Sequence, residues 1–220
     1  MKNSAPWSIK KLGNTTKACI KNGNRLLEDA KYLFDFGSYA SAYALSKLAQ
    51  EEFAKSFILK LVEAGSLKWT MEVRKSLKHH VSKQLMGIIL EYLNPSTEEF
   101  FKMLKDNTLF KKPTKVSDAI NIYIHEVLRR WESQNWDWAE DPRYDEEAKS
   151  VYRGKEEKLK QDAIYVKISK DGQAINFPTK FEQVDAEEEI EKAGRYGQFL
   201  NLKGDLRYKE IAEIFRALKY

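Results

Sequence analysis

The side chains best suited to chemistry lie in two neighbouring stretches of the N-terminal half. The first, residues 38–64, carries Glu51, Glu52 and Lys55 in the middle of a mostly apolar segment. A carboxylate among apolar side chains must be paired, hydrogen-bonded or protonated, because an isolated buried charge is costly. Glu51 and Lys55 also have the i,i+4 spacing of a favourable helix ion pair. The three residues are candidates for supporting a functional site, and the alternative is a buried structural ion pair.

The second stretch, residues 74–84, reads RKSLKHHVSKQ and holds two of the three histidines. A histidine surrounded by cations suits general acid–base catalysis on a phosphodiester. Arg74 and Lys83 would then stabilise the negative charge that develops in the reaction. His80 lies at the border of the apolar stripe, whereas His79 points toward the lysine-rich side. The alternative is a pair of surface histidines on a basic helix.

Two predicted helices position these residues. Residues 38–64 form one helix, which begins with Ser38 as its N-cap and ends near Gly65. The next helix begins between residues 66 and 76 and runs to Leu93, before Asn94 and Pro95. Consecutive helices joined by a short link are expected to be antiparallel neighbours, which brings Glu51 and Glu52 toward His80. A glutamate there would fix the tautomer of His80 and raise its basicity.

On the helix of residues 38–64, the polar face is predicted to consist of Ser46, Lys47 and Gln50. Glu52 lies away from that face, among leucines. A Glu/His metal site is conceivable, but the chain has no HExxH motif and a single cysteine. We therefore predict no metal and no cofactor, and we interpret His125 as a packing or surface residue.

The remaining pattern predicts a mainly α protein. Residues 1–13 look like a loose leader, and further helices are predicted over residues 15–36, 96–106, 117–136 and 205–220. Residues 139–162 are highly charged, and Asp171-Gly172 between two β-prone runs predicts a hairpin. A capping box of Asp185 and Glu188 opens another helix, in a region interrupted by Gly194, Gly197 and Gly204.

The expected fold is an up-and-down helical bundle with a small β-hairpin inserted in the C-terminal part. Residues 1–138 would form the bundle. Residues 139–220 would supply the charged segment, the hairpin and the C-terminal helices, packed on the bundle as one domain.

Composition bounds the class of protein. The 220 residues carry a net charge of +5, and residues 1–117 hold 20 basic and 11 acidic side chains. A basic half favours RNA or an acidic protein partner, and a solvated lysine surface is the alternative. No apolar run is long enough for a membrane span or a signal peptide, so we expect no membrane partner. The single cysteine, Cys19, fits a reducing cytoplasm.

The order of these motifs resembles the AbiV family of the HEPN superfamily. Residues 24–59, NRLLEDAKYLFDFGSYASAYALSKLAQEEFAKSFIL, are similar to the family's opening, which ends in a Glu-Glu-x-x-Lys block. That block is Glu51, Glu52 and Lys55 here, and the family's later His-x-x-Lys element matches His80 and Lys83. Residues 158–193, with a Tyr-Val hairpin, a proline and an acidic helix, also fit. The resemblance covers about residues 20–95 and 150–195.

The resemblance implies a HEPN-like bundle and a role in abortive infection, in which a phage-infected bacterial cell shuts itself down. Many HEPN proteins are metal-independent endoribonucleases with an Arg-x(4–6)-His motif, and they often work as homodimers that pair two motifs. Arg74 precedes His79 by four intervening residues and His80 by five. One departure is Lys75, because active members often have Asn, Asp or His directly after the arginine.

Two functional hypotheses follow. In the first, His80 is the general acid or base of an RNase, Arg74 binds the scissile phosphate, and Glu51, Glu52 and Lys55 orient the site. In the second, the chain is a non-catalytic interaction protein that blocks translation or senses a phage-encoded activator through a protein partner. Trp131, Trp136 and Trp138 could form an interface for such a partner or simply pack a helix end.

Overall fold

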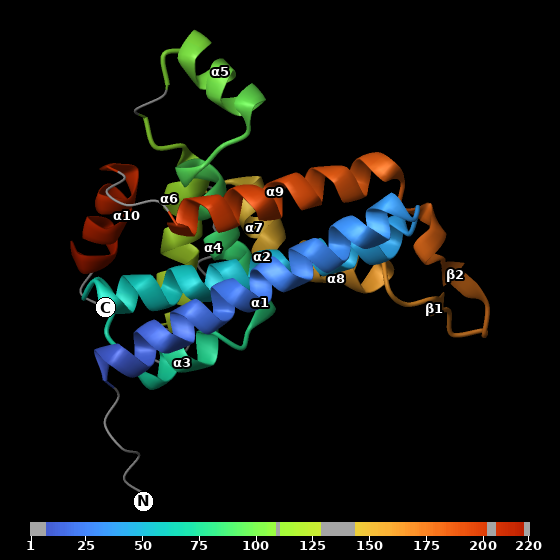
Figure 1. Ribbon diagram of the computed structural model, residues 1–220, viewed down its shortest axis with the longest axis horizontal. Coiled ribbons are helices and arrows are strands. Elements are labelled where there is room, and N and C mark those ends of the chain that lie inside the picture. The colour runs from blue at the N-terminus through green and yellow to red at the C-terminus, as the bar shows by residue number, and fades with distance from the viewer. Residues whose placement is uncertain (1–7, 109–110, 129–143, 202–205, 218–220) are drawn as a thin grey trace, which may run out of the picture.

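Two long antiparallel helices form the base of the molecule. The computed structural model describes residues 8–108, 111–128, 144–201 and 206–217, and Figure 1 shows their arrangement. Helix α1 (Ile9–Asp35) packs along α2 (Tyr39–Glu63) over most of its length. Helix α1 begins earlier than the sequence predicts, because the Ser8 side chain caps it by accepting a hydrogen bond from the Lys11 N–H.

Both helices end in a glycine turn that the sequence predicts. Gly37 and Gly65 have φ angles of +73° and +68°, a left-handed conformation that favours glycine. At the first turn the Ser38 N–H donates to Leu33 O (2.8 Å), and at the second the Ser66 N–H donates to Leu61 O (2.8 Å). These are Schellman motifs, which satisfy carbonyls at each helix end and reverse the chain. Ser38 is the N-cap of α2, although its side chain makes no capping hydrogen bond.

Helix α9 (Gln183–Asn201) is the third long element and packs against both α2 and α1. It runs unbroken through Gly194 and Gly197, so the predicted interruption there is wrong. The reason is packing: a Cβ at Gly197 would lie 3.0 Å from the Phe53 ring. The glycine lets α9 approach α2 closely. Asp185 lies inside the first turn rather than at the cap, and its carboxylate accepts from the Glu182 N–H (2.8 Å).

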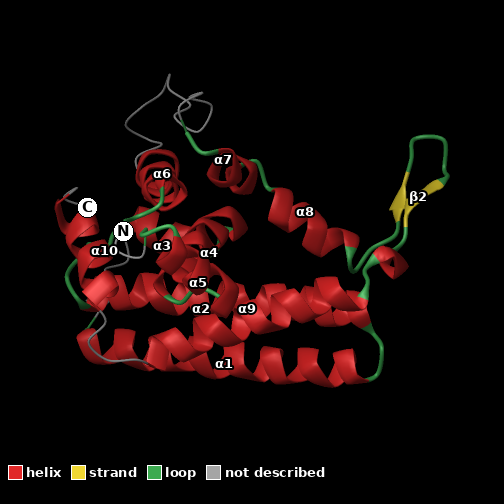
Figure 2. Cartoon of the chain, turned by 90° about the horizontal axis from the view of Figure 1, so that it is seen from above, coloured by secondary structure: helices red, strands yellow, loops and turns green. Residues whose placement is uncertain are grey.

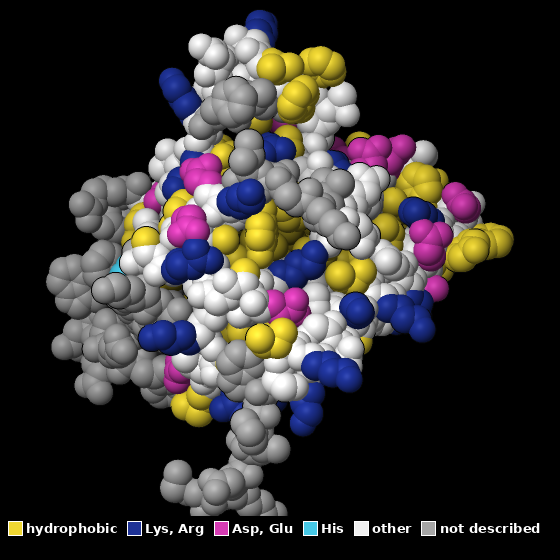
Figure 3. All heavy atoms as spheres, turned by 60° about the vertical axis from the view of Figure 1, so that its left-hand side comes forward, with side chains coloured by type: hydrophobic (Ala, Val, Ile, Leu, Met, Phe, Trp, Pro, Cys, Tyr) yellow, Lys and Arg dark blue, Asp and Glu magenta, His cyan; other side chains and the backbone are white. Residues whose placement is uncertain are grey.

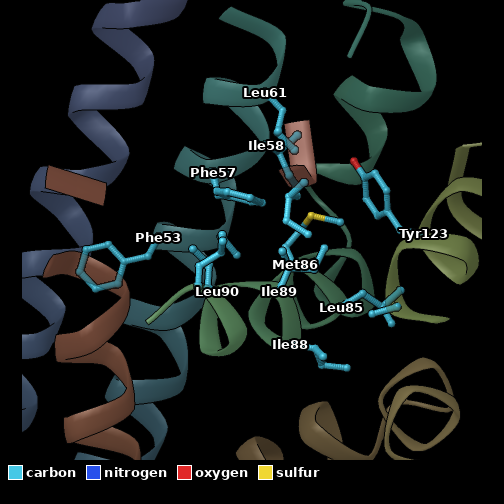
Figure 4. Close-up of a cluster of buried hydrophobic side chains, with 14 of the residues drawn as sticks. Phe53, Phe57, Ile58, Leu61, Leu85, Met86, Ile88, Ile89, Leu90 and Tyr123 are labelled. Carbon is cyan, nitrogen blue, oxygen red and sulfur yellow. The ribbon is translucent and has the colours of Figure 1, made fainter. Parts of the chain in front are cut away.

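The predicted helix ending at Leu93 is divided into α3 (Met71–Ser76) and α4 (His80–Leu93). Helix α4 packs on α2, and Figure 4 shows side chains of the two helices converging in the core, among them Phe57 and Ile58 with Met86 and Ile89. Full burial of such side chains is the main stabilising term for the fold. Figure 2 shows the layers, with α1 below, α2 and α9 above it, and α4 above those.

The outer layer is built from shorter elements. It contains α6 (Thr114–Ile122), a π-helical segment (Tyr123–Leu128), α7 (Glu146–Tyr152) and α8 (Lys155–Asp162). Helices α6 and α7 cover α4. The predicted helix that should begin at Ser117 begins at Thr114, after Pro113. Trp131, Trp136 and Trp138 lie outside the described residues. Helix α10 (Leu206–Ala217) places Phe215 in the core.

Two elements project from this body. Helix α5 (Thr97–Lys105) begins with the capping box of Ser96 and Glu99 and buries none of its residues. It stands apart in Figure 1, and its hydrophobic side chains gather at the top of the view in Figure 3. The predicted hairpin pairs β1 (Lys167–Ile168) with β2 (Ala174–Asn176) in an antiparallel register.

The structure confirms the mainly α fold with one small hairpin in the C-terminal part. None of the described helices combines the length and apolar character needed to cross a membrane. One prediction about α2 is wrong: Ser46, Lys47 and Gln50 are buried, although their polarity suggested a solvated face. The Ser46 hydroxyl donates to Ala42 O within the helix (2.8 Å), whereas the partners of Lys47 and Gln50 come from distant parts of the chain and adjoin the candidate site.

Candidate functional site

Glu51 is the centre of a compact buried cluster of charges. Its Oε2 lies 2.5 Å from the Lys83 Nζ, and its Oε1 lies 2.6 Å from the Lys160 Nζ. The same carboxylate reaches the His80 Nδ1, at 2.9 Å from Oε1 and 2.8 Å from Oε2. Glu51 and Lys83 side chains are each 6% exposed, whereas the His80 side chain is 45% exposed. The cluster therefore connects a buried anion to a histidine at the surface.

Three helices bring these groups together. Glu51 lies in the middle of α2, His80 and Lys83 lie in the first turn of α4, and Lys160 lies near the end of α8. His80 and Lys83 are three residues apart, which places both side chains on one helix face. These contacts confirm the prediction from the sequence that α2 and α4 face each other.

The contacts of His80 Nδ1 bear on which of the two ring nitrogens carries the proton. Its Nδ1 is bordered by Glu51 and by the Glu157 Oε2 (3.3 Å), and by one ammonium, that of Lys160 (3.0 Å). A neutral Nδ1 lone pair would face two carboxylates, so the form with a proton on Nδ1 is favoured and donates to Glu51. In that tautomer Nε2 carries the lone pair and is the ring atom that can exchange a proton with a substrate.

The charge state of Glu51 follows from its partners. Burial of the carboxyl group acts to raise its pKa, but Lys83 and Lys160 outweigh that effect and hold the pKa below its usual range. Glu51 is therefore ionised at neutral pH. An ionised Glu51 both neutralises two buried ammonium groups and fixes the orientation of the His80 ring.

A second ion network continues from this cluster along α2. The Lys47 Nζ lies 2.5 Å from Glu156 and 2.7 Å from Glu189, and the Gln50 amide donates to the Glu189 carboxylate (2.7 Å). Burial acts to lower the pKa of Lys47, but Glu189 and Glu156 outweigh it and raise that pKa. Lys192 joins this network through Glu189 (3.9 Å) and also pairs with Glu91 (2.8 Å). A small cavity of about 70 Å³ lies among these groups, and Glu51 and Lys83 also line it.

Glu52 and Lys55 do not join the cluster. They form an i,i+3 ion pair with each other, instead of the predicted pair between Glu51 and Lys55. Glu52 also contacts the Cys19 thiol on α1, where burial and then the Glu52 charge raise the thiol pKa. Glu52 is thus directed toward α1, because residues 51 and 52 are separated by about 100° around the helix. Among the described residues, Glu52 and Lys55 contact each other and α1, so no contact with His80 or Glu51 supports their predicted role of orienting the site.

Arg74 and His79 also lie outside the cluster of Glu51, His80 and Lys83. Arg74 is exposed on α3, and among the described residues its side chain has no hydrogen bond or ion pair. His79 is the N-cap residue of α4, and its exposed side chain makes no capping hydrogen bond. The turn between α3 and α4 separates Arg74 from His80 onto different elements.

Two members of the site were not predicted from the sequence. Lys160 and Glu157 come from the charged segment of residues 139–162, which carried no motif. They are three residues apart and pair with each other (2.6 Å) as well as with the Glu51 and His80 pair. Their i,i+3 spacing predicts a common helix face, but nothing in the sequence indicates which glutamate or histidine that face meets.

Ligand atoms of Glu51, His80 and Glu157 lie within 4.8 Å of one another, a spacing that could suit a metal ion. The two oxygens of Glu51 are, however, already paired with Lys83 and Lys160. A divalent cation would have to displace these ammonium groups. The donor set favours ion pairing over metal coordination.

The chain thus folds as a helical bundle in which Glu51, Lys83 and Lys160 form a buried cluster with the half-exposed His80. A family model, HEPN_AbiV, described as AbiV, matches residues 11–198. Because the match spans most of the chain, the protein belongs to the AbiV family. No curated protein and no solved structure matches the chain. Membership indicates a role in abortive infection, that is, in antiviral defence.

Proposed function

We propose that the protein is an abortive-infection effector that halts growth of infected cells by cleaving RNA with His80 as general base or acid. The observation that carries the proposal is the contact between His80 Nδ1 and the ionised Glu51 (2.8 Å), with the imidazole partly exposed to solvent. A carboxylate on Nδ1 orients the ring and leaves Nε2 as the ring atom that can exchange a proton with a substrate. Nε2 would take the proton from the ribose 2′-hydroxyl as its oxygen attacks the phosphorus. The bond between phosphorus and the 5′-oxygen would break, and the leaving 5′-oxygen would take up a proton from water.

The cations around the site support this chemistry. Lys83 and Lys160 keep Glu51 ionised, so that the carboxylate stabilises the imidazolium that forms when His80 takes a proton. Arg74 would bind the scissile phosphate, as the family resemblance implies, and its exposed guanidinium, which has no ion pair among the described residues, is available for that role. Because Arg74 lies on another element than His80, we propose that a homodimer completes the site with the Arg74 of a second copy.

An RNA cleavage assay in a metal chelator tests the proposal. His80→Asn is the sharpest variant, because the Asn amide can still donate to Glu51 while the proton-accepting Nε2 is lost. We expect cleavage by the wild type and its loss in His80→Asn, with the thermal midpoint nearly unchanged. Lys78→Ala is the matched control, since Lys78 is an exposed cation two residues away. Equal cleavage by His80→Asn and the wild type would exclude His80 as the proton-transfer group.

The non-catalytic alternative is favoured by one observation. Both oxygens of Glu51 are paired with buried lysines from two other helices, which is also the pattern of an ion network that only joins α2, α4 and α8. In that case the protein would act through a partner that blocks translation or through a phage-encoded activator. The wild type would then leave RNA intact, and Glu51→Gln would lower stability without any nuclease activity to lose.

A further inference from the structure

An open groove of about 660 Å³ lies at the N-terminal end of α4, where His79, Val81 and Ser82 line it. Its walls come from α3, from the first turn of α4, from the π-helical segment and from Tyr152 at the end of α7. A volume of this size accommodates a small organic ligand. His79, which makes no contact with the Glu51 cluster, lines the groove.

One end of the groove is suited to an anion. The first N–H groups of a helix have no partner within the helix, and at α4 the His79 side chain does not cap them. The first turn of α4 contains no acidic residue of its own, and the Glu51 carboxylate at this helix end is paired with His80 and Lys83. Lys75 and His79 line the groove and are both exposed, and Glu72, also on α3, lines it as well. A helix N-terminus flanked by cations binds phosphate groups.

Ser82 provides an independent sign that a ligand belongs there. Its side chain is 1% exposed, and its Oγ has no hydrogen-bond partner among the described residues. The residue lines the groove and lies in the first turn of α4. A buried hydroxyl without a partner is unfavourable unless something else receives its hydrogen bond. A phosphate oxygen at the helix end would be that acceptor.

The other end of the groove is suited to a nucleobase. Val127 of the π-helical segment and Tyr152 of α7 form an apolar and aromatic wall. The Tyr152 hydroxyl donates to the Glu126 Oε2 (3.3 Å), which places a carboxylate beside the ring. Aromatic rings stack on bases, and carboxylates accept hydrogen bonds from exocyclic amino groups.

We propose that this groove binds a nucleoside phosphate unit, with the phosphate at the N-terminus of α4 between Lys75, His79 and Ser82, and with the base against Tyr152. The inference rests on the proposed function and deepens it, because the groove is lined by His79 and Val81, the residues before and after His80 in the chain, and would hold a nucleotide of the RNA near that histidine. The same chemistry could come from RNA or from a free nucleotide. In this proposal His79 and Ser82 bind the phosphate and do not transfer protons.

Isothermal titration with two probes tests the inference. The first probe is a short oligonucleotide methylated at every 2′-hydroxyl, which binds without being cleaved, and the second is adenosine monophosphate. We expect saturable binding of the oligonucleotide, about tenfold weaker in Ser82→Ala because a hydrogen bond to a charged oxygen is lost. Ser82→Ala removes a hydroxyl that has no partner, so its thermal midpoint should not fall. The exposed Lys78 does not line the groove, and Lys78→Ala should bind like the wild type.

The two probes also distinguish the sources of the ligand. Weakened binding of both probes in Ser82→Ala supports a site for free nucleotides as well as RNA, whereas an effect on the oligonucleotide alone supports RNA. The inference is overturned if neither probe binds saturably, or if Ser82→Ala and His79→Ala both leave the binding of the oligonucleotide unchanged. His80→Asn should still bind the oligonucleotide. If the wild type binds but never cleaves RNA, the proposed function fails while the groove assignment stands.

Discussion

Replacing Glu51 by Gln should be among the most destabilising polar substitutions in the chain. The change leaves the Lys83 ammonium, which is 6% exposed, without the carboxylate 2.5 Å away. Removing one partner of a buried ion pair costs about 3–5 kcal/mol, because a buried charge is left uncompensated. Lys160 keeps Glu157 at 2.6 Å, so the lower end of this range, about 3 kcal/mol, applies here.

For a chain of this length, that loss corresponds to a fall of about 6–12 °C in the thermal midpoint. Glu52→Gln is the matched control, since Glu52 is the next residue and its pair with Lys55 is partly exposed. Such pairs contribute less than about 1 kcal/mol. Urea denaturation followed by circular dichroism measures both free energies of unfolding.

The double variant Glu51→Gln with Lys83→Met gives a further check. It replaces the uncompensated ammonium by an apolar side chain of similar length, so most of the lost stability should return. Equal free energies of unfolding for Glu51→Gln and Glu52→Gln would refute the assignment of Glu51 as a buried counter-ion. Failure of the second substitution to recover stability would show that the cost does not arise at Lys83.

Three further predictions concern stability. Gly197→Ala should lower the free energy of unfolding by about 1–3 kcal/mol, because its Cβ would lie 3.0 Å from the Phe53 ring. On the same helix, a Cβ at Gly194 meets nothing within 4 Å, so Gly194→Ala should raise that free energy by up to about 1 kcal/mol. The two variants should therefore shift the thermal midpoint in opposite directions. Phe53→Ala should lower the free energy of unfolding by about 3–5 kcal/mol, because Phe53 is fully buried. Phe101→Ala on α5 should change it by less than about 0.5 kcal/mol, because Phe101 is 62% exposed. Comparable losses for the two variants in urea unfolding would contradict the assignment of Phe53 to the core and of Phe101 to the surface. The pKa of Glu51 is lower in the folded than in the unfolded chain, so the unfolded chain takes up the proton first as the pH falls. The stability that the Glu51 carboxylate contributes is therefore complete above about pH 4.3 and is lost as the pH falls through the folded pKa. The free energy of unfolding, measured from pH 7 to pH 3, should vary less with pH in Glu51→Gln than in the wild type.

The helices that carry the site were predictable because their signals are local. The glycine turns at Gly37 and Gly65 fix where α1 and α2 end, and the short link after Gly65 makes α2 and α4 neighbours. That proximity was enough to predict that a glutamate meets His80. It did not decide between Glu51 and Glu52, because both lie near the predicted contact and a small rotation of the helix exchanges them.

The remainder depends on contacts between distant segments. Lys47 looked solvated because its partners, Glu156 and Glu189, lie more than 100 residues further along the chain. Lys160 was missed for the same reason. Local propensity marks Gly197 as a helix breaker. The residue is a glycine because α9 approaches Phe53 closely there, and a contact between distant segments does not enter local propensity. In each case tertiary packing overrides a local signal.

The measurement that tests the central claim most directly is the rate of RNA cleavage, in a chelator, by the wild type and by His80→Asn. General acid–base catalysis contributes about 10²–10⁴-fold, so the rate should fall by at least about 100-fold in His80→Asn, while the thermal midpoint stays within a few degrees of the wild type. Cleavage at the wild-type rate by a folded His80→Asn protein, or no cleavage by the wild type, would contradict the account.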